Sequence, residues 1–153
     1  MMLPEPDRTF LMVASRTTRI RLALADGDIE GAEAIARGVL EDLRAKGVVV
    51  LEAEALVALA TAHLEADRFE EAGSELAGAV ELAERFGERR VLWEALALSA
   101  DLHERRGADE EAAGLRRRAL GIVEEIVHGL ADRNLRRRFL SRADVHALGA
   151  VGR

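Results

Sequence analysis

The sequence has no cysteine, no tyrosine and only two prolines among its 153 residues. Because cysteine is absent, disulfide bonds, zinc–thiolate sites, iron–sulfur clusters and a cysteine nucleophile are all excluded. Aromatic residues make up 3% of the chain, so a nucleic-acid site that stacks bases on aromatic rings is nearly excluded as well. The scarcity of proline leaves little room for a fold rich in loops.

Long apolar runs are also missing. The compact run Val48–Leu51 is far shorter than the roughly 20 residues that a membrane-spanning helix needs. Residues 1–7 carry acidic side chains and prolines where a signal peptide would carry basic residues and then an apolar stretch. The sequence therefore predicts a cytoplasmic protein that does not bind membranes.

Hydrophobic residues make up 49% of the chain and charged residues 33%, which is enough to bury a core and keep a polar surface. The length fits one domain or one short array of repeats. The formal net charge of −6 argues against a general nucleic-acid binder. This charge is unevenly spread: residues 1–113 hold 13 basic and 24 acidic side chains, whereas residues 114–153 hold nine basic and four acidic ones. The chain therefore has a basic end.

An internal repeat with a period of 40 residues organises the sequence. Turn signals followed by acidic residues and an alanine recur at 27–32, 67–72 and 107–112. Between them, apolar residues three and four apart are typical of amphipathic helices. The pattern predicts helix pairs at 7–25 with 29–46, 49–66 with 69–86 and 89–106 with 108–129, then a closing helix at about 132–147.

We expect a single domain over residues 7–148, with short tails at 1–6 and 149–153. Its repeats span about 7–46, 49–86 and 89–129. Helix N-caps are expected at Asp7, Asp28 and Asp132, and helix ends at Gly47, Gly87 and Gly107. The run 48–51 could form a strand, but its flanking residues favour the start of a helix.

The repeat positions resemble those of tetratricopeptide repeats (TPRs). The middle repeat fits best, at Leu56, Leu59, Ala60, His63, Ala72, Leu76 and Ala79, with His63 where the family usually has an aromatic residue. The third repeat matches at Leu96, Ala100, His103, Ala112 and Ala119 but has Ser99 and Arg116 at two signature positions, and the first matches at Ile20, Ala32, Ala36 and Val39. The resemblance covers about residues 13–148 and implies an all-α fold, a right-handed α-solenoid of about three repeats with a C-terminal capping helix.

The period of 40 exceeds the usual 34. This long form is similar to the C-terminal TPR regions of bacterial signalling ATPases and transcription activators, and residues 126–140 look like their closing segment. The resemblance implies a non-enzymatic, regulatory protein–protein interaction scaffold. It leaves open whether the chain is free-standing or the tail of a longer protein.

In the family, the first helices of the pairs line a concave groove. The matching residues are Thr17, Arg21, Leu24, Glu54, Val57, Thr61, Leu64, Glu65, Glu94, Ala97, Asp101, Glu104 and Arg105. Most of the charges are acidic, so we expect a basic or amphipathic protein segment as the partner. Of the positions that hold a peptide carboxylate in some relatives, only Arg21 carries a suitable side chain.

Two other functions stay open. The Arg-rich C-terminal end could bind nucleic acid or another anionic partner. A homodimer could form through this basic end or through the apolar first helix. Alternatively, His63 and His103, one repeat apart, could bind a metal, although a packing role is the simpler interpretation. No phosphate-binding glycine loop and no HExxH motif is present, and Ser99, Asp101 and His103 diverge on one helix. We therefore expect no enzyme activity, no cofactor and no metal.

Overall fold

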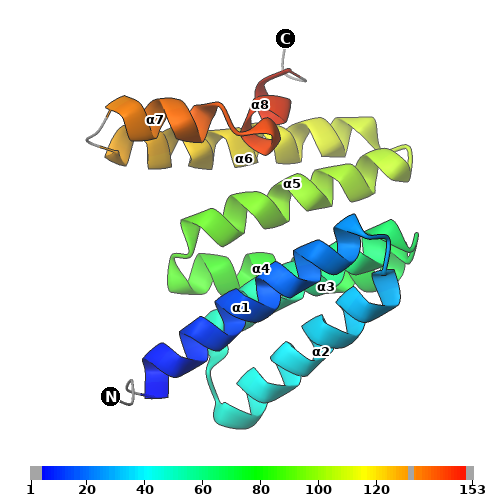
Figure 1. Cartoon of the computed structure of the whole chain (residues 1–153). Helices are drawn as coiled ribbons and strands as arrows, with labels where there is room; N and C mark the ends of the chain where they lie inside the picture. The colour runs from blue at the N-terminus through cyan, green and yellow to red at the C-terminus, as the bar shows by residue number, and fades with distance from the viewer. Residues whose placement is uncertain (1–4, 131–132, 151–153) are drawn as a thin grey trace. The chain divides into compact units, whose positions relative to one another are not determined.

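Helices contain nearly all the residues that the computed structural model describes, which are 5–130 and 133–150 (Figure 1). The α-helices are α1 (Glu5–Ala25), α2 (Ile29–Lys46), α3 (Glu52–Glu65), α4 (Phe69–Phe86), α5 (Arg89–Arg105), α6 (Asp109–Gly129), α7 (Arg133–Leu140) and α8 (Ala143–Ala150), with a short 3₁₀-helix at Val49–Leu51. No strand occurs within these residues, so the all-α prediction is confirmed for them. The run 48–51 begins a helix, as its flanking residues indicate.

The chain divides into two compact units, Met1–Leu82 and Ala83–Arg153, and the boundary falls within α4. In the first unit, α1, α2 and α3 pack against one another. In the second unit, α5 and α6 form an antiparallel pair, and α7 and α8 pack on α6 (Figure 1). The sequence predicts one domain over 7–148, which stays a prediction beside this division into two compact units.

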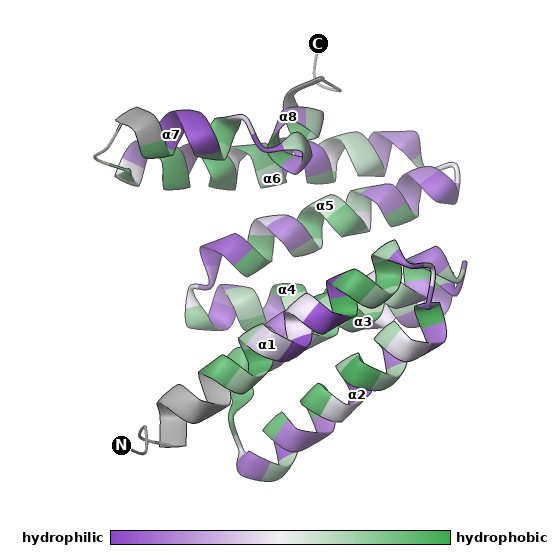
Figure 2. Cartoon of the chain, viewed as in Figure 1, coloured by the Kyte–Doolittle hydropathy of each residue, from purple (hydrophilic) through white to green (hydrophobic). Residues whose placement is uncertain are grey.

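Buried side chains recur at the predicted period. Val13, Ala53 and Trp93 are each 40 residues apart and at most 2% exposed. The small residues Ala32, Ala72 and Ala112, early in the second helix of each pair, are at most 1% exposed. Bands of hydrophobic and hydrophilic residues follow one another along the helices (Figure 2). This banding is typical of amphipathic helices, which bury one face.

The turns between helices also repeat their geometry. In each, the amide of a residue with positive φ donates to the carbonyl three residues earlier, and the next amide donates to the carbonyl five residues earlier. The positive-φ residues are Gly27, Gly47, Asp67, Gly87 and Gly107. This hydrogen-bond pattern satisfies the last carbonyls of a helix and needs the left-handed conformation that glycine adopts most easily. The predicted helix ends at Gly47, Gly87 and Gly107 are confirmed.

The N-cap predictions have different outcomes. Asp28 caps α2, because its Oδ1 accepts a hydrogen bond of 2.9 Å from the amide of Gly31. Asp7 is not an N-cap, because α1 begins at Glu5 and already includes it. Asp132 lies outside the described residues.

The predicted closing helix at 132–147 is divided into α7 and α8. At the break, the Ser141 hydroxyl donates to the Arg138 carbonyl, and the Arg142 amide turns to the Phe139 carbonyl, three residues earlier. A serine that hydrogen-bonds its own backbone competes with helix continuation. Among the described helices, none is both long and apolar enough to cross a lipid bilayer.

Candidate functional site

The candidate groove residues of the first unit lie on α1 and α3, as expected. Arg21 and Glu65 are exposed, and the half-buried residues are Thr17, Leu24, Glu54, Val57 and Thr61. Leu64 is 3% exposed, so it belongs to the core and is closed to a partner. The hydroxyls of Thr17 and Thr61 donate to carbonyls four residues earlier, at 2.8 Å each.

The candidate residues of the second unit all lie on α5. Asp101, Glu104 and Arg105 are exposed, whereas Glu94 and Ala97 are half-buried. The acidic side chains here have intramolecular partners: Glu94 Oε1 lies 3.4 Å from Arg90 and 4.0 Å from Arg142.

Arg116, on α6, is the main partner of the exposed carboxylates of α5. Its guanidinium contacts Glu104 and lies 3.2 Å from Asp101. The hydrogen bond from Arg116 to Glu104 raises the pKa of the guanidinium above its ordinary value. Arg116 replaces the small or apolar residue of the other repeats, Ala36 and Leu76, and thus lowers the negative charge that α5 presents.

A charged cluster surrounds His63 in the core of the first unit. The His63 side chain is 1% exposed, its Nδ1 lies 2.8 Å from Glu75 Oε2, and its Nε2 lies 3.2 Å from Glu33 Oε1. The Glu33 carboxylate is also bound by Arg37 at 2.6 Å and Arg68 at 2.8 Å. The cluster therefore links α2, α3, the following turn and α4 through ionisable groups.

Burial and charge act oppositely on the two carboxyls. The contact with His63, assisted by Arg37 and Arg68, holds the pKa of Glu33 below its ordinary value. Burial raises the pKa of Glu75, and the hydrogen bond to His63 opposes that rise only in part. The His63 ring and the two carboxylates are largely buried, whereas Arg37 and Arg68 reach the surface, so the cluster can stabilise and orient the helices that it links.

Sequence reasoning assigned His63 a packing role with a polar tip and missed the carboxylates around it. A signal was present in the repeat register. Glu75 stands where the other repeats have Ile35 and Leu115, and Glu33 stands where they have Gly73 and Ala113. A charge at a position that is apolar or small in the sister repeats indicates a partner in the core.

His103, the repeat equivalent of His63, has a different environment. It is half-buried, and its Nδ1 lies 2.7 Å from the carbonyl oxygen of Ser99. Within the described part of the chain, no three histidine, aspartate or glutamate side chains are arranged to hold a metal ion. The metal hypothesis for His63 and His103 therefore gains no support from the geometry.

Trp93 anchors the closing helices of the second unit. It is 1% exposed, and the ring of Phe139 meets it edge-on with centroids 6.4 Å apart. The Arg142 guanidinium lies 5.6 Å from the Trp93 centroid and is held by Asp144 at 2.7 and 3.1 Å. Trp93 is thus a core residue that reports on the placement of α7 and α8.

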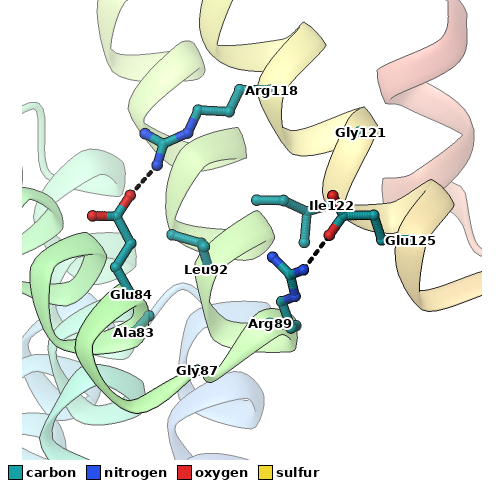
Figure 3. A pocket seen from close by; sticks show the side chains of 9 residues that line it. All are labelled: Ala83, Glu84, Gly87, Arg89, Leu92, Arg118, Gly121, Ile122 and Glu125. Carbon is teal, nitrogen blue, oxygen red and sulfur yellow. Dashed lines mark hydrogen bonds and ion pairs between the residues drawn. The ribbon is translucent and has the colours of Figure 1, made fainter. Parts of the chain in front are cut away.

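A hollow of about 430 Å³ lies at one end of the α5–α6 pair (Figure 3). Leu92 and Ile122 form its apolar part, and two ion pairs flank them: Arg118 with Glu84, and Arg89 with Glu125. These four charges balance, so the hollow has no net charge that would attract a ligand of either sign.

No model of a known protein family matches the chain, and no curated protein sequence matches it. The observations above define a class, an all-helical protein whose hairpin turns repeat every 40 residues. The likeness to TPRs remains a resemblance carried by the residues quoted for it.

Proposed function

We propose that this chain is a TPR-type scaffold for protein–protein interaction, without enzyme activity of its own, which binds a basic or amphipathic segment on the first helices of its repeats. The binding residues would be the accessible candidates on α1 and α3 in one unit and on α5 in the other. Stacking of the repeats as a right-handed solenoid is part of this proposal, as are a bacterial cytoplasmic setting and a regulatory role in signalling.

The observation that supports the proposal most is the repeated turn. The same two hydrogen bonds close the helices at Gly27, Asp67 and Gly107, 40 residues apart, and a buried alanine follows each turn five residues later. Repeats of this kind bury their small residues against neighbouring helices and present an extended surface to partners. Charged side chains on α3 and α5 then favour a segment of opposite charge.

A comparative pull-down tests the proposal. The variant reverses four candidate carboxylates: Glu54→Lys, Glu65→Lys, Glu94→Lys and Asp101→Lys. The matched control reverses four exposed carboxylates that are not candidates: Glu30→Lys, Glu41→Lys, Glu81→Lys and Glu124→Lys. We expect wild type and control to retain the same proteins from a bacterial lysate and the variant to lose them. Identical protein sets in all three would contradict the proposal.

A further inference from the structure

One side of α7, with the start of α8, forms a basic and apolar hollow in the second unit. Its volume is about 500 Å³, and its lining residues, here called the α7 face, are Arg136, Arg137, Leu140, Ser141 and His146. Leu140 follows Arg136 by four residues and Arg137 by three, so both arginines neighbour it on the helix surface. Leu140 is 45% exposed, so the hollow presents an apolar side chain together with two arginines.

Several basic side chains of the C-terminal end have acidic partners, whereas the two arginines of the α7 face have none among the described residues. The basic residues counted in 114–153 include the arginines of α6 and Arg142. Of these, Arg116, Arg118 and Arg142 are each paired with described carboxylates. Arg136 instead donates from Nε to the neutral carbonyl of Leu130, and no carboxylate among the described residues pairs with its charge. Arg137 is exposed, and no described carboxylate pairs with it.

We propose that the α7 face binds an acidic amphipathic helical segment of a partner protein. Two guanidinium groups on adjacent residues can each bind a carboxylate with two parallel hydrogen bonds, which is the strongest pairing available to arginine. Leu140 lines the same hollow and is exposed, so it can contact an apolar residue of the same segment. Because no carboxylate lines the hollow, the attraction needs no local ion pair to break first.

The same observations disfavour other anionic partners. Nucleic acid gains from stacking on exposed aromatic rings, but Phe139, the aromatic residue of α7, packs edge-on against Trp93. A membrane surface needs a broad apolar face, and α7 offers only Leu135 and Leu140 as exposed large hydrophobics. The inference does not rest on the proposed function, because the acidic candidates on α3 and α5 would select a segment of the opposite sign.

The test uses a fluorescein-labelled peptide of about 15 residues, with leucines at helical three- and four-residue spacing and glutamates elsewhere. Fluorescence anisotropy measures its affinity for the full chain. We expect wild type to bind it, and Arg137→Glu and Leu140→Gln each to weaken binding by about tenfold or more. Trp93 fluorescence checks that α7 is still packed in each variant.

Arg138→Glu is the matched control, since it makes the same charge change on an exposed side chain of the same helix that does not line the hollow. The affinity of Arg138→Glu for the labelled peptide should fall by about twofold at most. Equal losses for the two arginine variants would overturn the proposal, because they would show attraction to α7 without use of the hollow. Tighter binding of a single-stranded oligonucleotide or of anionic lipid vesicles than of the peptide would also overturn it. So would salt-sensitive self-association of the chain that Arg137→Glu abolishes.

Discussion

His63 shows what a single ionisable residue does at a packing position. Both ring nitrogens face carboxylates, and the side chain is almost fully buried. Its removal takes the hydrogen-bond partner from Glu75, whereas Glu33 keeps Arg37 and Arg68. Burying a carboxylate without a partner costs more free energy than the lost contact alone. We therefore expect the cluster to stabilise the first unit only while each buried carboxylate keeps a partner.

Replacing His63 with phenylalanine, the residue type that the TPR resemblance favours, should lower the free energy of unfolding by about 3 kcal/mol, because the largely buried Glu75 loses its hydrogen-bond partner and Glu33 loses one of its three contacts. His103→Phe at the equivalent repeat position should cost less than about 1 kcal/mol, since His103 hydrogen-bonds a backbone carbonyl and pairs with no carboxylate among the described residues. Urea unfolding followed by far-ultraviolet circular dichroism measures both. An equal loss in the free energy of unfolding for His63→Phe and His103→Phe would mean that the contacts of His63 with the carboxylates do not add to stability.

The two carboxyls of the cluster predict opposite pH dependences. The folded-state pKa of Glu33 lies below its ordinary value of 4.5, so its stabilisation is present above that pH and is lost as the pH falls through the folded-state pKa. The folded-state pKa of Glu75 is raised, so ionising it as the pH increases disfavours the native state. Relative to wild type, Glu33→Gln should therefore become less stable as the pH rises from about 3 to 7, whereas Glu75→Gln should become more stable.

Thermal unfolding of both variants across this pH range checks the signs. Glu41→Gln, which changes an exposed carboxyl on α2, is the control. The difference in stability between this variant and wild type should not change with pH. Parallel trends for Glu33→Gln and Glu75→Gln would contradict the assigned shifts. Register comparison across repeats could have indicated both carboxyls, but the sequence does not contain the distances that give their shifts opposite directions.

At the scale of the elements, the sequence predicts most helices closely. Expected bounds at 29–46, 69–86 and 89–106 agree with α2, α4 and α5 to within one residue at each end. Turn chemistry explains this agreement, since the glycines at the helix ends adopt the left-handed conformation. The break between α7 and α8 was missed, because it depends on a serine hydroxyl bonding a nearby carbonyl and not on glycine or proline.

The start of α2 gives a prediction about a cap. A Cβ atom on Gly31 would lie 2.1 Å from Asp28 Oδ2, whereas a Cβ on Gly38, in the same helix, would meet nothing within 4 Å. Gly38→Ala should stabilise the chain by about 0.5–1 kcal/mol through helix propensity. Gly31→Ala should gain nothing, because the lost N-cap costs about 1 kcal/mol.

Chemical denaturation of these two variants in the Asp28→Ala background completes the test. With the capping side chain removed, Gly31→Ala should stabilise the chain about as much as Gly38→Ala does. If Gly31→Ala changes the free energy of unfolding by the same amount with and without Asp28, the N-cap does not determine the effect of an alanine at position 31.

At the scale of the whole molecule, both proposed binding surfaces depend on how charge is distributed along the chain and on which charges are paired. The acidic excess of residues 1–113 and the basic excess of 114–153 are plain in the sequence. The sequence does not show which charges are paired. Arg116 offsets Asp101 and Glu104, whereas Arg136 and Arg137 have no carboxylate partner among the described residues. The division of the chain at Leu82 and Ala83 was also not predicted, because the 40-residue repeat continues through α4 without a change in composition.

The central claim is that accessible carboxylates on the first helices of the repeats bind a basic segment. The direct measurement is the affinity of a labelled basic amphipathic helical peptide for wild type, for the Glu54/Glu65/Glu94/Asp101 reversal and for the Glu30/Glu41/Glu81/Glu124 reversal. We predict similar binding by wild type and the second variant, about tenfold or greater weakening in the first, and loss of affinity with added salt. Equal affinities for all three proteins, or no binding by wild type, would contradict the account.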